Sequence, residues 1–348
     1  MAQLVEMMRV TLFGSRNDAP GSSKGTAFDP ARVIPSLAGK VILVTGAAGD
    51  LGRNTAVQLA KYGKPARIHV ADLPRESPAE KEELLRRIAH EAYGEDDDAA
   101  GEDAATRTEF EFLDLDLGSF ASVRACAADF LAREERLDIL VLNAGIITVA
   151  PRTTAEGYEA HFGINYLGHA LLSRLLVPTL VRTAEQQAQS DVRVVVVSSE
   201  GHAMAPKGGI QFEALKGTCA QMSYTQRYGQ SKVALISLAK QLARRCPQLR
   251  VAAVHPGRVI TGMAASLAQE SLLVRVTAPL APLICVQPAQ GVRNHLWAAT
   301  SPDVVTGKYY EPVGIPDREA AVAKDEELSD KLWEWTEKEL AGVGTLPK

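Results

Sequence analysis

The stretch VILVTGAAGDLG, residues 41–52, decides the fold of this chain. It joins a short β-branched run to a turn that contains three glycines. A helix-like segment follows at 55–63, and a second strand-like run, ARIHVAD, follows at 66–72. Strand, helix and strand within about 30 residues are typical of a βαβ unit, in which two parallel strands share a sheet and the helix covers it.

The same alternation continues along the chain. Strand-like runs lie at 109–115, 138–145, 193–199 and 250–257, with helical patterns between them, and a possible seventh strand lies at 307–312. A parallel sheet that is covered on both faces needs such near-continuous apolar strands separated by helices. The sequence therefore predicts an α/β fold in a single domain, with a Rossmann-type, doubly wound, mostly parallel sheet of six to seven strands.

The folded domain is expected to span residues 40–342. Residues 1–39 are expected to form an N-terminal arm or linker, because Gly, Pro, Ser and Asp are frequent from residue 14 onward. The acidic segment 91–108 carries few large apolar side chains, so we expect a solvated surface insertion there. Segments at about 200–225 and 262–286 are expected to form loops around the substrate, and 325–340 a docking helix.

Composition argues against several classes of function. The chain has 348 residues, with 38 Lys and Arg against 42 Asp and Glu, so no positive excess favours nucleic acid or an anionic membrane as a partner. Its four cysteines are widely spaced and fit neither a zinc site nor a disulfide framework, so we expect no metal and a reducing, cytoplasmic location. No transmembrane segment is predicted, because Arg275 and two prolines break the longest apolar run, 272–286.

The glycine turn predicts a dinucleotide site. Gly46, Gly49 and Gly52 let backbone N–H groups approach a pyrophosphate at the positive end of the following helix. Asp72 closes the second strand, where a carboxylate accepts hydrogen bonds from an adenosine ribose and repels a 2′-phosphate. These residues favour NAD over NADP, although the nearby Arg75 leaves NADP open.

A tyrosine and a lysine four residues apart predict proton transfer. Tyr228 and Lys232 share a helix face, and a nearby ammonium favours the phenolate over the phenol. Tyr228 is thus a candidate to exchange a proton with an alcohol or a carbonyl while a nicotinamide carries the hydride. Ser199 ends a valine-rich strand at the edge where ligands bind, and Asn165 places an amide in an otherwise apolar helix.

At this point the chain resembles the short-chain dehydrogenase/reductases, and more narrowly their retinol-dehydrogenase-like and fungal single-domain members. The resemblance covers about residues 28–340. It rests on motifs in a fixed order: TGAAGDLG at 45–52, VAD at 70–72, LDLGSFASVR at 115–124, NAG at 143–145, NYLGH at 165–169, VSS at 197–199, YGQSK at 228–232 and HPGRVIT at 255–261.

The resemblance implies a role for each matching residue. Tyr228 is the implied acid/base, Lys232 lowers its pKa and binds the nicotinamide ribose, Ser199 polarises the substrate oxygen, and Asn165 holds a water in a proton relay. The remaining residues would surround the cofactor: Thr45, Gly46, Gly49, Leu51 and Gly52 at the pyrophosphate, Asp116 and Leu117 at the adenine, Asn143, Ala144 and Gly145 beneath it, and Pro256, Gly257, Val259 and Thr261 at the nicotinamide end.

One position departs from the single-domain pattern. Asp50 stands where that pattern has its second glycine, and Gly49 lies one place earlier. Because a carboxylate that faces a pyrophosphate is unfavourable, we expect Asp50 to point away from it or to cap a helix that begins near Leu51.

The sequence thus predicts an NAD-dependent oxidoreductase that acts on an alcohol or ketone, with an apolar lid at about 263–286 that admits a lipophilic substrate. One alternative is an NADP-dependent ketoreductase of secondary metabolism. Another is a scaffold that senses a dinucleotide without catalysis, which predicts loss of the four catalytic candidates. By resemblance only, helices at about 165–180 and 228–245 would form the face of a homodimer or homotetramer.

Overall fold

The computed structural model describes residues 28–94, 107–186, 191–260, 262, 269 and 285–343. In this part of the chain, eight strands form one sheet in the order β3-β2-β1-β4-β5-β6-β7-β8. The strands are β1 (Val41–Thr45), β2 (Arg67–Asp72), β3 (Glu109–Asp114), β4 (Ile139–Leu142), β5 (Arg193–Val197), β6 (Arg250–Val254), β7 (Tyr309–Glu311) and β8 (Ile315–Pro316). All neighbours are parallel except β7 and β8.

This arrangement confirms the predicted doubly wound α/β fold. The chain builds β1, β2 and β3 outward in one direction and then returns to place β4 on the other side of β1. The six predicted strands and the possible seventh are all present. The two-residue β8, antiparallel to β7, was missed because so short a strand has no readable period.

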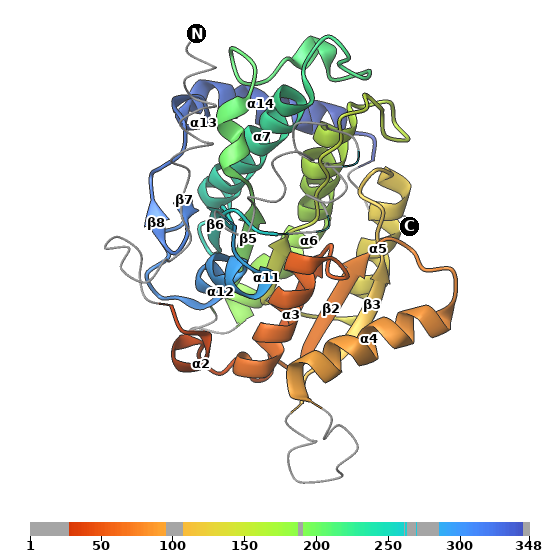
Figure 1. Cartoon of the computed structure of the whole chain (residues 1–348), viewed down its shortest axis with the longest axis vertical. Coiled ribbons are helices and arrows are strands. Elements are labelled where there is room, and N and C mark those ends of the chain that lie inside the picture. The colour runs from red at the N-terminus through yellow and green to blue at the C-terminus, as the bar shows by residue number, and fades with distance from the viewer. Residues whose placement is uncertain are drawn as a thin grey trace.

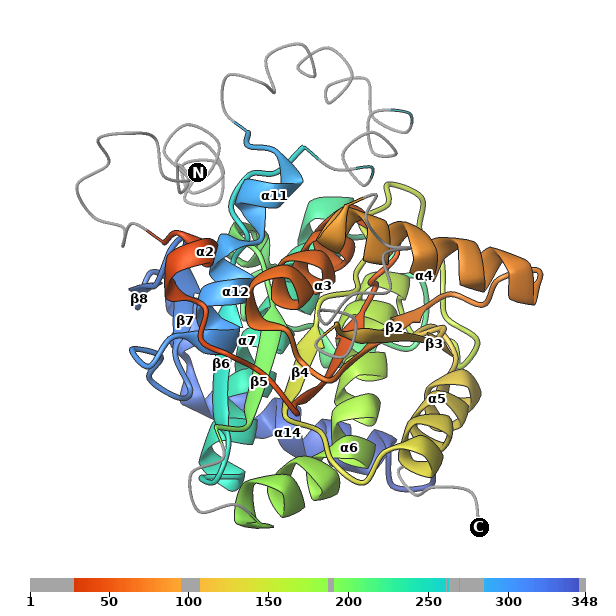
Figure 2. The same ribbon diagram turned by 90° about the horizontal axis from the view of Figure 1, so that it is seen from below.

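Helices cover both faces of the sheet (Figures 1 and 2). One face carries α2 (Pro30–Val33), α3 (Asp50–Gly63), α4 (Pro78–Tyr93), α11 (Pro288–Gly291) and α12 (Arg293–Thr300). The other carries α5 (Phe120–Arg133), the π-helix η3 (Phe162–Leu167), α6 (Gly168–Gln186), α7 (Tyr224–Arg245) and α14 (Glu326–Glu339). In β1, Ile42 and Val44 join the core under the first group, while Val41 and Leu43 join the core under the second. Alternate side chains of a strand point to opposite faces, so each face buries its own apolar set.

The packed structure begins before Lys40. Phe28 and Leu37 are buried in the core beneath α3, which places part of the expected arm inside the domain. At the other predicted insertion, α4 continues to Tyr93, so residues 91–93 belong to a helix. Residues 1–27, 95–106 and 344–348 lie outside the described part of the chain.

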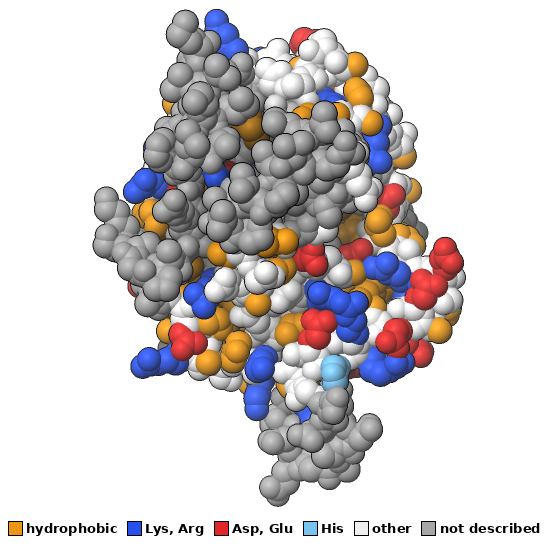
Figure 3. All heavy atoms as spheres, in the orientation of Figure 1, with side chains coloured by type: hydrophobic (Ala, Val, Ile, Leu, Met, Phe, Trp, Pro, Cys, Tyr) orange, Lys and Arg blue, Asp and Glu red, His pale blue; other side chains and the backbone are white. Residues whose placement is uncertain are grey.

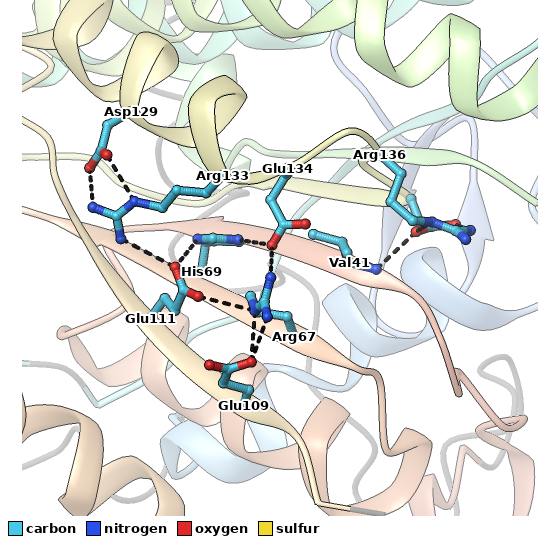
Figure 4. Close-up of polar contacts among 10 residues, drawn as sticks. Val41, Arg67, His69, Glu109, Glu111, Asp129, Arg133, Glu134 and Arg136 are labelled. Atoms are coloured by element: carbon cyan, nitrogen blue, oxygen red, sulfur yellow. Dashed lines mark hydrogen bonds and ion pairs between the residues drawn. The ribbon is translucent and has the colours of Figure 1, made fainter.

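Charged side chains connect β2, β3 and the end of α5 (Figure 4). Arg67 donates to Glu109 and to Glu134, each at 2.6 Å, and His69 lies 2.8 Å from Glu134. Burial is the main cause that lowers the pKa of His69, and the hydrogen bond to Glu134 opposes it. Because Arg67 and Glu109 each begin a strand, this network fixes the register of β2 against β3 at their amino ends.

The C-terminal helix α14 lies across α7 (Figure 1). Leu332 is buried in the core, the Thr336 hydroxyl lies 2.7 Å from the Tyr166 hydroxyl, and Gln241 donates to Ser329 at 2.9 Å. With α14 in place, residues 229–239 of α7 are buried on every side of the helix. Residues 229–239, part of one of the two helices that the resemblance assigns to a homodimer, are therefore covered by this chain itself.

No helix in the described residues is long and apolar enough to cross a membrane. On the face seen in Figure 3, Lys and Arg side chains lie among Asp and Glu side chains over the region of α3 and α4. That face carries charge of both signs rather than a patch of one sign.

Replacing Leu332 with alanine should lower the free energy of unfolding by about 2–5 kcal/mol, because it leaves a cavity where α14 meets the core. Glu334→Ala, at an exposed position of the same helix, is the matched control and should change stability by less than about 0.5 kcal/mol. Urea unfolding followed by circular dichroism measures both. Equal effects of the two changes would show that α14 does not dock through Leu332.

Candidate functional site

One cavity of about 810 Å³ lies at the carboxyl ends of the strands, next to β1 and β4. The strand order reverses between these two neighbours, because β2 and β3 lie on one side of β1 and β4 lies on the other. Open α/β sheets bind ligands at such a point. Of the sequence-predicted residues, these line the cavity: Gly46, Gly49, Leu51, Gly52, Asp72, Asp116, Leu117, Asn143, Ala144, Gly145, Ser199, Tyr228, Lys232, Pro256, Gly257 and Val259. Thr45 and Asn165 lie behind its wall, and Thr261 falls outside the described residues.

The glycine turn is built for close backbone approach. Gly46 has a φ of +66°, which favours glycine, and its N–H donates to the carbonyl of Ala71 at 2.8 Å. A Cβ on Gly52 would lie 2.2 Å from the Gly46 carbonyl oxygen, so α3 begins against the turn only because residue 52 has no side chain. The turn therefore exposes backbone to the cavity at the N-terminus of α3, the arrangement that anions prefer.

Asp50 does not cap α3, and its expected orientation away from a pyrophosphate stays a prediction. Gly49 is the N-cap residue, α3 begins at Asp50, and Asp50 lines the cavity. Its carboxylate instead accepts a hydrogen bond from the backbone N–H of Gly262 at 2.7 Å. The carboxylate therefore connects the glycine turn to the segment that follows β6.

Asp72 lies beside the glycine turn, at the end of β2. Its carboxylate accepts hydrogen bonds from the N–H groups of Ala48 and Leu73, each at 2.9 Å, and Arg75 approaches it to 3.5 Å. These contacts fix the orientation of the acid and place it at the cavity. Asp116 is held similarly, since it accepts from the N–H of Gly118 at 2.8 Å.

Thr45 supports the site from below. Its buried hydroxyl accepts the N–H groups of Asn143 at 2.9 Å and Ala144 at 3.0 Å, and the Asn143 amide returns a hydrogen bond to the Thr45 carbonyl. The turn after β4 is therefore locked to the end of β1. In this structure Thr45 shapes the backbone of the cavity instead of lining it.

The chemistry-bearing side chains converge at the other end of the cavity. Tyr228 and Lys232 lie one turn apart on α7, with the Lys232 Nζ 5.4 Å from the centre of the Tyr228 ring. Ser199 follows β5, and its hydroxyl is hydrogen-bonded to Tyr228. The Lys232 Nζ donates to the Val197 carbonyl at 3.2 Å. Three residues from two distant segments thus share one wall of the cavity.

Asn165 lies in the π-helix η3, just behind this wall. Its amide accepts from the Ile146 N–H at 2.8 Å and donates to the Ile146 carbonyl and to Ser231. A Cβ on Gly145 would lie 3.2 Å from the Asn165 Oδ1 and 3.6 Å from the Lys232 Nζ. The amide and the ammonium therefore face the same glycine. A π-turn within a helix is frequently associated with a functional site.

Burial dominates the electrostatics of the pair. It raises the pKa of Tyr228 to about 12, while the hydrogen bond from Ser199 lowers the pKa and the carboxylate of Glu200 raises it. It also lowers the pKa of Lys232 to about 7. The sequence predicts a lowered phenol pKa, and the structure differs, because burial disfavours the phenolate more than the Ser199 hydrogen bond favours it.

Sequence reasoning missed much of the apolar wall. Ile146, Ala160, Ile164 and Val197 also line the cavity. Ile146 follows a motif that singles out only Asn143 to Gly145, and the other three read as ordinary core. The missed polar lining residues include Arg152, Thr153 and Thr154. Their segment carries no motif, and its place after the end of a strand was the only sign that it lies near a ligand site.

The comparisons with known proteins agree with this geometry. A family model described as short chain dehydrogenase matches residues 40–272. The chain is 35% identical to an uncharacterized oxidoreductase of Schizosaccharomyces pombe over 88% of this chain and 86% of that protein. It is also 35% identical to retinol dehydrogenase 14 of Mus musculus, over 86% and 85% of the two chains. A third relative is the short-chain dehydrogenase/reductase drtF of Aspergillus calidoustus, 36% identical over 88% and 95%.

Solved structures show the same fold. An uncharacterized protein from Mycobacterium paratuberculosis superposes with a TM-score of 0.64 at 26% identity, covering 92% of this chain and all of that one. A short chain dehydrogenase from the same organism, bound to NAD, superposes with a TM-score of 0.57 at 21% identity, over 83% of this chain and all of that one.

Three histidines around the site should make folding sensitive to acid. Burial lowers the pKa of His169 to about 4 and those of His255 and His295 to about 3, from an ordinary value of 6.5. Below pH 6.5 these histidines bind protons in the unfolded chain but stay neutral in the native chain. Their contribution to the free energy of unfolding is therefore fully present above pH 6.5 and is lost as the pH falls. Between pH 6.5 and about 5, each histidine should cost up to about 2 kcal/mol.

Urea unfolding at several pH values measures this loss. His255→Leu should make the pH slope shallower by up to about 1.4 kcal/mol per pH unit, whereas His90→Gln, at an exposed position of α4, should leave it unchanged. A pH slope that is the same in His255→Leu as in the wild type would contradict the claim that burial lowers the pKa of His255.

Proposed function

Because this chain belongs to the short-chain dehydrogenase family, we propose that it transfers a hydride between a nicotinamide dinucleotide and an alcohol or ketone. The observation that carries the proposal is the single cavity that joins the glycine turn at one end to Ser199, Tyr228 and Lys232 at the other. A Rossmann-type turn without the second cluster would fit a binding protein. The two together fit an enzyme.

The residues present fit a dinucleotide. The glycine turn and the N-terminus of α3 suit a pyrophosphate, Asp72 suits the hydroxyls of an adenosine ribose, and Asp116 and Leu117 would flank the adenine. Asn143 to Gly145 and Pro256, Gly257 and Val259 line the remaining length. When bound, the nicotinamide ring supplies or accepts the hydride.

The side chains of this site handle the proton. In reduction, the phenol of Tyr228 donates its proton to the carbonyl oxygen of the substrate, which Ser199 orients by a hydrogen bond. In oxidation, the phenolate accepts the alcohol proton, and the ammonium of Lys232 favours that phenolate. Asn165, beside Lys232 and behind Gly145, is proposed to hold the water through which the proton reaches solvent.

We propose NAD as the preferred cofactor. Asp72 places a negative charge at the ribose position, where a 2′-phosphate would be repelled, and its two backbone hydrogen bonds keep the carboxylate in place. Arg75 lies against the same carboxylate and is already engaged by it. NADP remains the alternative, in which Arg75 would turn to the phosphate.

The substrate is proposed to be lipophilic. Ile146, Val197 and Val259 line the same cavity as Tyr228, and burying apolar surface there favours a hydrophobic alcohol or ketone. The relative named retinol dehydrogenase 14 supports this class of substrate. The predicted lid at 263–286 falls largely outside the described residues.

Replacing Tyr228 with phenylalanine should lower turnover by about a thousandfold or more, since it removes the proton-transferring hydroxyl and preserves the ring. Dinucleotide affinity, measured by fluorescence titration, should change little. A variant that keeps its turnover would contradict the proposed role. A non-catalytic scaffold would instead keep its cellular role after this change.

Replacing Asp72 with asparagine should weaken NADH binding and strengthen NADPH binding, each by about tenfold, because it removes one negative charge at the ribose position. Titration of the wild type and the variant with both cofactors measures the change. Glu76→Gln, at a nearby acid that does not line the cavity, is the control. Tight NADPH binding by the wild type, with none for NADH, would overturn the cofactor assignment.

A further inference from the structure

The four residues that follow Gly145 are held by buried side chains from elsewhere in the chain. The Asn165 amide accepts the Ile146 N–H at 2.8 Å and donates to the Ile146 carbonyl at 3.1 Å. The His161 Nε2 accepts the Thr148 N–H at 3.0 Å, and the Arg227 Nη2 donates to the Val149 carbonyl. Residues 146–149 contain no regular element, so these contacts take the place of a sheet or helix ladder.

The geometry determines which ring nitrogen of His161 carries the proton. A backbone N–H is always a donor, so the Nε2 that faces Thr148 must be the unprotonated acceptor. The proton therefore lies on Nδ1, which donates to the Glu159 Oε1 at 2.7 Å. The second Glu159 oxygen accepts the Phe162 N–H at 2.9 Å. Glu159 and His161 are both fully buried.

Arg227 is the second buried charge of the group. Only 1% of its surface is exposed, and its Nη1 lies 3.9 Å from the Glu159 carboxylate. Among the described residues, its Nε and Nη1 have no hydrogen-bond partner. A guanidinium buried with so few hydrogen bonds is expensive, and an apolar residue would stabilise the fold as well or better. This cost favours a role in function over one in stability.

The group touches the proposed acid/base directly. Arg227 precedes Tyr228 in α7, and the His161 ring meets the Tyr228 ring edge to face, with centroids 6.1 Å apart. Ile146, at the start of the held segment, lines the cavity together with Tyr228. The group of Glu159, His161 and Arg227 therefore contacts both the Tyr228 ring, through His161, and the backbone of Thr148 and Val149.

We propose that Glu159, His161 and Arg227 are positioning residues that hold Thr148 and Val149, and through them the segment that begins at Ile146, at a set distance from Tyr228. The segment then orients the alcohol or ketone for proton exchange with the phenol. None of the three touches the reacting atoms. The inference deepens the proposed function and rests on it.

Arg227→Met tests this role. It removes the charge and the hydrogen bond to Val149 at similar side-chain length. We expect kcat to fall by about 10- to 100-fold, because a displacement of about 1 Å near reacting groups costs that much. The dinucleotide Kd should stay within about twofold, since Arg227 does not line the cavity. Arg227→Lys, which keeps the charge beside Glu159, should recover most of the lost activity.

The control is Arg193→Met, at an equally buried arginine. Arg193 donates to the carbonyls of Ala298 and Ser301, beside β5 and away from the cavity. It should lose stability while keeping kcat. If Arg227→Met does not fold, His161→Phe serves instead, because it keeps an aromatic ring against Tyr228 and removes both hydrogen bonds.

Amide hydrogen exchange supplies a readout besides activity. In Arg227→Met, the peptide that covers 144–150 should exchange about tenfold faster, with β5 and α3 unchanged. Unchanged kcat and unchanged exchange in an active enzyme would overturn this inference and leave the proposed function standing. A wild type that turns over no alcohol or ketone with either cofactor would overturn both.

Discussion

The close contact between the turns that follow β1 and β4 is the constraint on which the site depends. A Cβ on Gly46 would lie 2.8 Å from the Ala144 Cα, so the two turns meet with no room for a side chain. The Thr45 hydroxyl binds the N–H groups of Asn143 and Ala144 across the same gap. The strand order reverses between the neighbours β1 and β4. This contact therefore exposes backbone without side chains at the carboxyl edge of the sheet, where open α/β sheets bind ligands.

The rest of the site is arranged around that contact. Gly145, the next residue, lies close to both the Asn165 Oδ1 and the Lys232 Nζ. Helix α7 brings Lys232 there because its residues 229–239 are buried on all sides, with α14 covering the side that the sheet does not. A helix that is enclosed in this way has little freedom to slide or rotate. The packing of the core under α5, α6, α7 and α14 therefore sets the distances from Tyr228 to Ser199 and to the glycine turn.

The strands, the glycine turn and the residues at the strand ends could largely be predicted from sequence, whereas much of the apolar wall of the cavity could not. Runs such as RVVVV are apolar without interruption, which indicates a strand covered on both faces, and strand ends then identify Asp72, Asn143 and Ser199 as neighbours of a ligand. The pKa of Tyr228 could not be predicted from its spacing to Lys232. Burial acts on both groups, and its extent depends on residues far apart in the chain. The contact from Asp50 to Gly262 and the burial of Arg227 likewise arise only from tertiary packing.

The most direct measurement is a crystal structure of the protein grown with NAD. We expect electron density for the adenosine ribose at Asp72, for the pyrophosphate at the turn from Gly46 to Gly52, and for the nicotinamide ring beside Tyr228 and Lys232. A nucleotide bound elsewhere on the molecule, or one whose nicotinamide lies at Asp72 and whose adenine lies at Tyr228, would contradict the assignment of this cavity as an oxidoreductase site.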